Sequence, residues 1–197
     1  MKQFTKENLF WIREPKEFEI SDDKIVMVTE PDTDLWQETH YNNSADTAPV
    51  LQMQTDQEYF IFTVKASFNY VDLYDQCGIA IYLDSKNWMK ASSENIDDHQ
   101  KLGSVVTNNG FSDWATRDIP ANINHIWYRL TREKADFIIE TSFDGENFKQ
   151  MRIFHLHKAE GKSEISFGLY ACSPWDGPFT ATFSEMKIEE IEKSSHK

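Results

Sequence analysis

Hydrophobic and polar residues alternate with a period of two in short blocks along this chain, and Asn, Asp, Gly and Pro separate the blocks. The clearest block runs from Tyr59 to Tyr70, where Phe60, Phe62 and Val64 share one face and the other face is more polar. Such alternation predicts a half-buried antiparallel strand, because successive side chains of a strand point to opposite faces. An apolar stripe with helical spacing is not sustained for three turns anywhere in the sequence.

Similar blocks predict further strands over residues 76–83, 88–95, 127–132, 136–143, 148–154, 165–172 and 179–183. The first two flank a turn at 84–87 and predict a hairpin, and Asp144-Gly145 marks another tight turn. About ten short strands without intervening helices favour an all-β sandwich of two antiparallel sheets. The polar stretches 97–107 and 108–124 are interpreted as long loops, and the charged end 189–197 as frayed. Because no linker interrupts the blocks, we expect one domain over residues 1–197.

Charge and composition narrow the classes of partner. The 197 residues carry 20 basic and 33 acidic side chains, a net charge of −13, which argues against nucleic acid and anionic membranes. The first residues lack the apolar stretch of a signal peptide, and no run is long enough to span a membrane, so we expect a cytoplasmic protein. Cys77 and Cys172 are too few for a disulfide framework and have no zinc-binding spacing. We therefore expect free thiols and no cofactor.

Two histidines stand out as possible metal ligands. His155 and His157 would share one face of a strand, but a third ligand is not evident in the sequence. Solvent exposure is the simpler interpretation, and we expect no metal site.

Small residues lie opposite the predicted core positions on two strands. Gly78 and Ala80 occupy this face on one of them, and Gly168 occupies it on the other. Glycine within a strand is destabilising and often marks the close approach of another group. The pattern therefore predicts a hollow second face with room for a ligand.

Aromatic and polar side chains surround this predicted hollow. If Met89 points into the core, the pleat sends Trp88, Lys90 and Glu94 to the opposite side. Aromatic planes combined with a few charged groups are typical of a cleft for a polar ligand. The alternative is an ordinary surface ion pair between Lys90 and Glu94, with Trp88 only covering the sheet. The predicted ligand-binding residues are Trp36, Tyr41, Gln76, Tyr82, Trp88, Lys90, Glu94, Asp113, Trp114 and Tyr170.

Two further positions admit more than one role. Trp114 lies in a polar stretch and must either pack back onto the sheet, the interpretation favoured here, or stay exposed for a partner. Asp113 beside it can act as an acid or, as is usual for Ser-Asp pairs, form a turn. Cys172 has no basic neighbour in the sequence to lower its pKa, so we do not expect a nucleophile there.

The chain resembles the family called domain of unknown function 1349 in six ordered blocks: DLWQETHY, YDQCGIAIYLDSKNWMKASSEN, SVVT, FSDWAT, SFDGENF and YACSP. The resemblance covers nearly the whole chain, and some family members are named regulation-of-enolase proteins. It implies a concanavalin A-like lectin/glucanase jelly roll with a ligand site on the concave face. Ser92 and Ser93 depart from the pattern, since relatives often have Gly-Val before the glutamate. The family's recurring polar and aromatic positions fall on Trp36, Thr39, Tyr41, Asp75, Gln76, Trp88, Lys90, Glu94, Ser112, Asp113, Trp114 and Ser173.

Three functions are compatible with these features, because this fold does not determine activity. The first is a module that binds a carbohydrate or another polar small molecule on the concave face. The second is a glycoside hydrolase that uses Glu94 with Asp113 or Asp75, although the E-x-D-x-E strand signature of the glucanases is absent. The third is a regulatory protein that acts through contacts with a protein partner, which the sequence does not identify.

Overall fold

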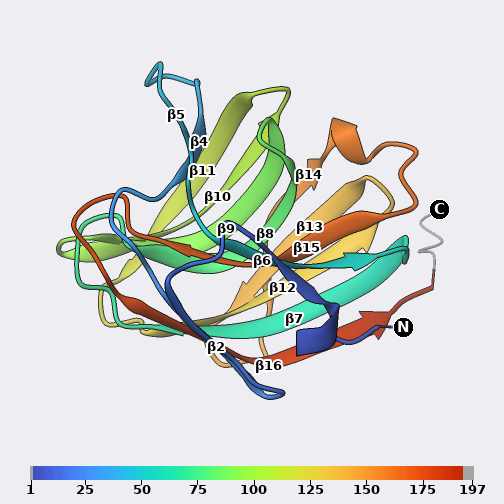
Figure 1. Cartoon of the computed structure of the whole chain (residues 1–197), viewed down its shortest axis with the longest axis horizontal. Coiled ribbons are helices and arrows are strands. Elements are labelled where there is room, and N and C mark those ends of the chain that lie inside the picture. Colours follow the sequence, from blue (N-terminus) through green and yellow to red (C-terminus); the bar gives the residue numbers. More distant parts are fainter. Residues whose placement is uncertain (1, 193–197) are drawn as a thin grey trace.

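The structure, a computed structural model, describes residues 2–192 and consists mainly of antiparallel strands (Figure 1). Sheet A has the order β1 (Leu9–Ile12), β6 (Val50–Thr55), β15 (Ile165–Cys172), β8 (Gln76–Asp84), β9 (Asn87–Ile96), β10 (His99–Asn108) and β11 (Phe111–Pro120). Sheet B has the order β14 (Lys149–His155), β13 (Asp136–Ser142), β12 (His125–Glu133), β7 (Tyr59–Phe68), β16 (Thr180–Glu190), β3 (Lys24–Val28) and β2 (Glu17–Ile20). A small hairpin joins β4 (Leu35–Gln37) to β5 (Ser44–Asp46). The predicted β-sandwich is confirmed.

Helical structure within residues 2–192 is limited to two short 3-10 turns, η1 (Lys6–Asn8) and η2 (His157–Ala159). Among these residues, no helix has the length and apolar character needed to cross a membrane.

The main core lies between the two sheets. Phe60, Phe62 and Val64 of β7 are completely buried, as their alternation predicted. They belong to the same buried cluster as Ile79 of β8 and Met89 of β9. Burial of such large side chains contributes roughly 1.5–3 kcal/mol each. The inward face of each sheet therefore follows directly from the sequence pattern.

The predicted hairpin over β8 and β9 is confirmed, and the structure supplies its register. Gln76 lies opposite Glu94, and Tyr82 lies opposite Trp88. Side chains at directly opposite positions share one face of a sheet. These four residues are consequently on the outer face of sheet A, the face directed away from sheet B, while Met89 points inward.

The prediction of long loops over 97–107 and 108–124 was wrong, because these stretches form the β10–β11 hairpin. Asn109 and Gly110 form its turn with φ values of +54° and +84°. Asn-Gly favours such two-residue turns, so the signal was present in the sequence. Residues 108–124 looked like a loop because β11 is an edge strand and most of its residues are exposed. Residues 97–107 looked like one because several buried positions of β10 are polar, among them Gln100, Ser104 and Thr107.

The charged C-terminal end was also only partly predicted. Strand β16 continues through Glu190 and pairs with β7 up to that residue, so the predicted fraying does not begin at residue 189. Residues 193–197 of the predicted frayed end lie outside the described residues.

A second, smaller buried cluster forms where the β4–β5 hairpin and its flanking residues lie over the outer face of sheet A. In Figure 1 this hairpin rises beside β10 and β11. The Thr33 N–H donates to the carbonyl oxygen of Ser173 (3.1 Å), and the Gln37 N–H donates to Ser112 Oγ (2.9 Å). The buried cluster consists of Leu35, Ala48, Val50, Ala80, Trp88, Val105, Tyr170 and Cys172.

Candidate functional site

A cleft of about 430 Å³ opens on the outer face of sheet A, beside the β4–β5 hairpin. Strands β8, β9, β10 and β11 form its floor and one wall, and the hairpin and the loop after β15 contribute the rest. Six of the ten predicted ligand-binding residues line it: Trp36, Tyr41, Gln76, Lys90, Glu94 and Trp114.

Lys90 is the central charged group of the cleft floor. Its residue is 5% exposed, and its Nζ donates to Asp34 Oδ1 at 2.8 Å and to Gln76 Oε1 at 3.0 Å. Burial alone would lower the pKa of Lys90, but Asp34 together with Cys172 and Glu94 outweighs it, so that this pKa lies above its usual value. Lys90 is therefore a fixed ammonium group held by residues from two distant parts of the chain.

Gln76 connects the two acidic groups of the cleft. Its Oε1 accepts from Lys90, while its Nε2 donates to Glu94 Oε1 (3.2 Å) and to the carbonyl oxygen of Tyr74 (3.1 Å). The Tyr170 hydroxyl completes the network at 3.1 Å from Gln76 Oε1 and 2.5 Å from Ser92 Oγ. Networks of this kind hold polar side chains in one orientation.

Glu94 has the most strongly altered pKa among the groups lining the cleft. Burial raises this pKa from its ordinary value of 4.5 to about 7, and the attraction of Lys90 offsets only part of the effect. Lys101 lies directly opposite Glu94 on β10 and also favours the carboxylate. Near neutral pH, Glu94 can therefore either donate or accept a hydrogen bond.

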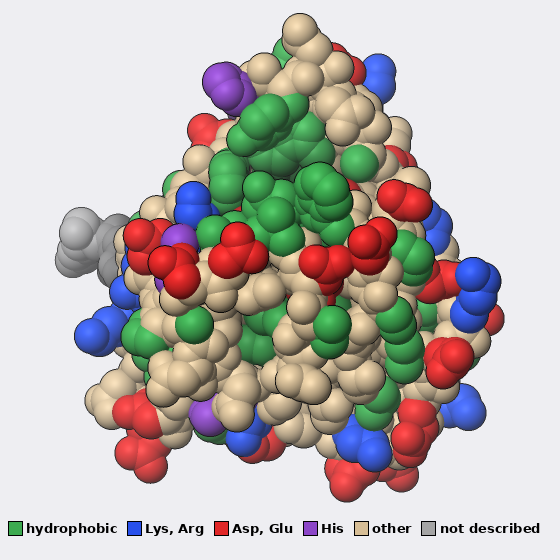
Figure 2. Space-filling model, turned by 90° about the vertical axis from the view of Figure 1, so that its left-hand side faces the viewer, with side chains coloured by type: hydrophobic (Ala, Val, Ile, Leu, Met, Phe, Trp, Pro, Cys, Tyr) green, Lys and Arg blue, Asp and Glu red, His purple; other side chains and the backbone are tan. Residues whose placement is uncertain are grey.

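Aromatic side chains form the upper rim. The rings of Trp36 and Trp114 meet edge to face at 6.3 Å, and the rings of Trp36 and Tyr41 meet in the same way at 5.4 Å. Figure 2 shows hydrophobic side chains gathered below the apex of the molecule, where the β4–β5 hairpin lies, and acidic side chains below them. Trp114 is 40% exposed and Tyr41 is 59% exposed, so both rings are accessible to a ligand.

Trp88 and Tyr82 are on the predicted face but not in the cleft. Trp88 is completely buried, because Leu35 and Ala48 from the hairpin region belong to the cluster that covers it. The Tyr82 hydroxyl donates a hydrogen bond of 2.8 Å to Oδ2 of Asp46, the last residue of β5. The prediction that the Trp88 ring stacks on a ligand was wrong, because a distant segment covers this ring, whereas Tyr82 is partly exposed but lies outside the cleft.

Tyr170 does not line the cleft either. It lies completely buried beneath the floor and acts through the Gln76 network. The alternative in which Trp88 only covers the sheet is close to what the structure shows at that end of β9.

The two carboxylates proposed as catalytic partners of Glu94 are elsewhere. Asp113 pairs with Arg152 of β14 and points to the side of β11 opposite Trp114. Asp75 is completely buried and accepts hydrogen bonds from Ser173 Oγ (2.6 Å) and from the backbone N–H of Val71 (2.8 Å). Neither carboxylate lines the cleft, so neither can act beside Glu94 there as the hydrolase alternative required.

The glycines predicted to leave room for a ligand have a different role. A Cβ at Gly78 would lie 2.0 Å from the carbonyl oxygen of Ala91, and one at Gly168 would lie 1.9 Å from that of Leu51. Glycine is required at both positions because a neighbouring strand approaches closely. Gly103 is the glycine that does line the cleft, where a Cβ would meet Trp114 Nε1 at 3.1 Å.

Sequence reasoning missed several cleft residues. The pairing of Asp34 with Lys90 was missed because it joins residues 56 positions apart, and no pattern within one segment of the sequence predicts such a contact. Lys101 and Gly103 were missed because their strand was interpreted as a loop. Correct use of the Asn109-Gly110 turn signal would have placed both on one face of β10, opposite Glu94 and Ser92.

Comparison with known proteins identifies the family. A family model described as Protein of unknown function (DUF1349) matches residues 11–191. The chain belongs to this family. Regulation of enolase protein 1 from Saccharomyces cerevisiae is 33% identical over 178 residues, which cover 90% of this chain and 87% of that protein. The family resemblance found in the six sequence blocks is thus confirmed.

Solved structures support the same fold. A crystal structure described as a functionally unknown protein from Saccharomyces cerevisiae has a TM-score of 0.87 at 31% identity and covers 95% of this chain and 99% of its own. The GH43 protein BlXynB from Bacillus licheniformis has a TM-score of 0.73 at 14% identity and matches 96% of this chain but only 38% of its own. An alginate lyase from Klebsiella pneumoniae has a TM-score of 0.55 at 10% identity, covering 92% of this chain and 87% of its own. At such low identity, the last two show the fold alone.

Proposed function

We propose that the cleft binds a carbohydrate or another polar small molecule. The observation that supports this most directly is an accessible aromatic rim above a floor of ordered polar groups. Ligand sites commonly measure about 300–1,000 Å³ and combine aromatic surface with a few well-placed polar groups. The cleft, at about 430 Å³, has this size and this composition.

In this proposal, the aromatic side chains stack on the ligand and the polar side chains form hydrogen bonds with it. Trp114 offers an exposed ring face that can stack on the apolar face of a sugar, and Trp36 holds that ring from the side. Glu94 and Lys101 can form hydrogen bonds with the hydroxyl groups of a sugar. The Glu94 carboxyl group can donate or accept these bonds, whereas the Lys101 ammonium group only donates them. Fold neighbours described as a xylan beta-1,4-xylosidase and an alginate lyase act on polysaccharides, which supports this ligand class by analogy of fold only.

The test is calorimetric titration with monosaccharides and with oligosaccharides of xylose, glucose and mannuronate. We expect Trp114→Ala to weaken binding of any sugar that binds the wild type by at least about tenfold, a loss of ~1.4 kcal/mol. Phe111→Ala is the matched control, because Phe111 is a 66% exposed aromatic residue of the same strand outside the cleft. Binding that is equal in Trp114→Ala and the wild type would contradict the proposal. Absence of binding to every sugar would overturn the carbohydrate form of the proposal and favour action through protein contacts, as the name of the yeast relative suggests.

Hydrolysis of a glycoside is the second candidate, and the pKa of Glu94 is the observation that favours it. A glycosidase needs one protonated carboxyl group and one carboxylate on either side of the bond. Glu94, with a pKa of about 7, suits the first role, and Asp34, paired with Lys90, suits the second. Release of reducing sugar by the wild type, lost in both Glu94→Gln and Asp34→Asn, would support this function. No release from any sugar that binds would leave binding as the function of the cleft.

A further inference from the structure

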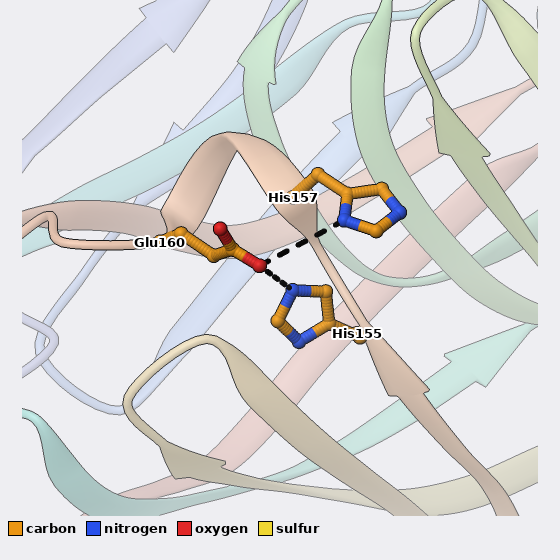
Figure 3. Close-up of side chains that lie close together, drawn as sticks. All are labelled: His155, His157 and Glu160. Carbon is orange, nitrogen blue, oxygen red and sulfur yellow. Dashed lines mark hydrogen bonds and ion pairs between the residues drawn. The ribbon is translucent and has the colours of Figure 1, made fainter.

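Two histidines and a glutamate converge where β14 ends and η2 begins. His155 is the last residue of β14, His157 is the first of η2, and Glu160 follows η2 directly. Figure 3 shows the Glu160 carboxylate reaching toward both imidazole rings. None of the three lines the cleft of sheet A, so this group of residues is independent of the proposed function.

The three potential ligand atoms are close enough to surround a single ion. Glu160 Oε1 lies 2.8 Å from His155 Nε2 and 3.9 Å from His157 Nδ1, and the three ligand atoms lie within 4.8 Å of one another. In a tetrahedral zinc site with bonds of about 2.0–2.1 Å, ligand atoms are about 3.4 Å apart. Small rotations of exposed side chains would bring these atoms to that spacing without moving the backbone.

His155 is already oriented as a metal-binding histidine would be. Its Nδ1 lies 2.6 Å from Asp136 Oδ1, and Asp136 is its direct neighbour on β13. Histidines that bind metals usually engage a carboxylate through their second ring nitrogen, which fixes the ring and makes the binding nitrogen more basic. This contact leaves His155 Nε2 directed at Glu160.

The backbone that carries the two histidines is held from a separate hairpin. Asn108, at the end of β10, donates from Nδ2 to the His155 carbonyl oxygen (3.0 Å) and accepts from the His157 N–H at Oδ1 (3.1 Å). The ammonium group of Lys158 lies 3.3 Å from Asp84 Oδ2, so it is paired outside the group of three residues. The hydrogen bonds of Asn108 thus fix the backbone positions of both histidines.

We infer that His155, His157 and Glu160 bind one divalent transition-metal ion, with Zn²⁺ best suited to the site and water completing its coordination. Two imidazole nitrogens and one carboxylate oxygen form a ligand set typical of zinc, whereas Ca²⁺ and Mg²⁺ prefer oxygen ligands alone. The side chains of His157 and Glu160 are 59% and 64% exposed, so an ion can enter from solvent. The sequence showed no third ligand because Glu160 lies beyond the strand, and only the turn of η2 brings it back.

The experiment is a calorimetric titration of untagged, chelator-treated protein with ZnCl₂. A thermal unfolding experiment then measures the melting temperature with and without zinc. We expect one ion per chain and a higher melting temperature with zinc, because an ion that binds only the folded state stabilises it. His157→Asn should abolish saturable binding. Asp136→Asn should weaken binding about 10–100-fold, since Asp136 only positions His155.

His99→Asn provides the matched control. His99 also lies near two carboxylates, with Nδ1 2.6 Å from Asp98 and Nε2 3.6 Å from Asp118, but among residues 2–192 no second histidine joins them in a group of ligands. Binding in this variant should equal that of the wild type. The inference is overturned if the wild type binds no zinc, if His157→Asn binds as tightly as the wild type, or if His99→Asn weakens binding as much as His157→Asn. Urea unfolding of each variant confirms that it is folded, and sugar binding by His157→Asn should be unchanged.

Discussion

The two ends of the outer face of β9 differ in whether other residues cover them. At one end, Trp88 is completely buried in the cluster formed with Leu35 and Ala48. At the other end, Lys90 and Glu94 line a cleft that contains space for a ligand. All three side chains point to the same side of the same strand, yet only the second end is available for binding.

The difference comes from a segment that lies far away in the sequence. The hairpin region between β3 and β6 crosses sheet A, and its apolar residues cover Trp88. The same segment places Asp34 beside Lys90 and Trp36 beside Trp114. It therefore buries one end of the face and builds the wall of the cleft at the other end.

Replacement of Trp88 should have the largest effect on stability. Trp88→Ala removes a completely buried ring and should lower the free energy of unfolding by about 3–5 kcal/mol. Trp114→Ala at the open end should lower it by about 1 kcal/mol or less, because its ring is 40% exposed. Urea unfolding of both variants provides the measurement, and equal losses would contradict the contrast between the two ends.

The charge state of Glu94 should make stability depend on pH. Because the pKa of Glu94 is about 7 in the folded protein and about 4.5 in the unfolded chain, the folded state holds this proton more tightly. The resulting stabilisation is complete below pH 4.5 and is lost as the pH rises through 7, an effect of about 3 kcal/mol. Unfolding of the wild type and Glu94→Gln across this range should show a loss that is absent in the variant. Parallel curves would mean that Glu94 is not buried as described.

Loss of the buried ammonium group should cost less than loss of Trp88. Lys90→Met leaves Asp34 and Gln76 without their donor and should lower the free energy of unfolding by about 1.5–3 kcal/mol. Lys101→Met, on the neighbouring strand and also in the cleft, should stay within about 0.5 kcal/mol. A stable Lys90→Met variant would show that the pair with Asp34 is an ordinary surface contact.

The two kinds of glycine should respond differently to an added methyl group. Gly78→Ala places a Cβ against the backbone of Ala91 and should cost about 1–3 kcal/mol. Gly103→Ala meets neighbours at 3.0–3.1 Å and should cost less, but it should move the Trp114 ring and change its fluorescence. Equal costs at both positions would argue against a special role of Gly78 in strand packing.

Much of the sandwich could be predicted because period-two alternation reports directly on strand faces. Phe60 and Phe62 were placed in the core correctly, and Gln76 and Glu94 were placed correctly on the opposite face of their sheet. The β10–β11 hairpin was missed although Asn109-Gly110 marked its turn, because the edge strand β11 is mostly exposed and several buried positions of β10 are polar. Six of the ten predicted site residues line the cleft, and three of them, Gln76, Lys90 and Glu94, do so because the faces of their strands were assigned correctly.

The sequence by itself determined which side of each main strand faces the core, because that choice depends on neighbouring residues and on the pleat of the backbone. Only the tertiary structure decided which part of the outer face stays open. That decision depends on contacts between residues far apart in the chain, such as Lys90 with Asp34 across 56 positions and Gln37 with Ser112 across 75. Alternation within one strand carries no information about the segment that will cover it, and for this reason Trp88 and Glu94 looked equivalent in the sequence.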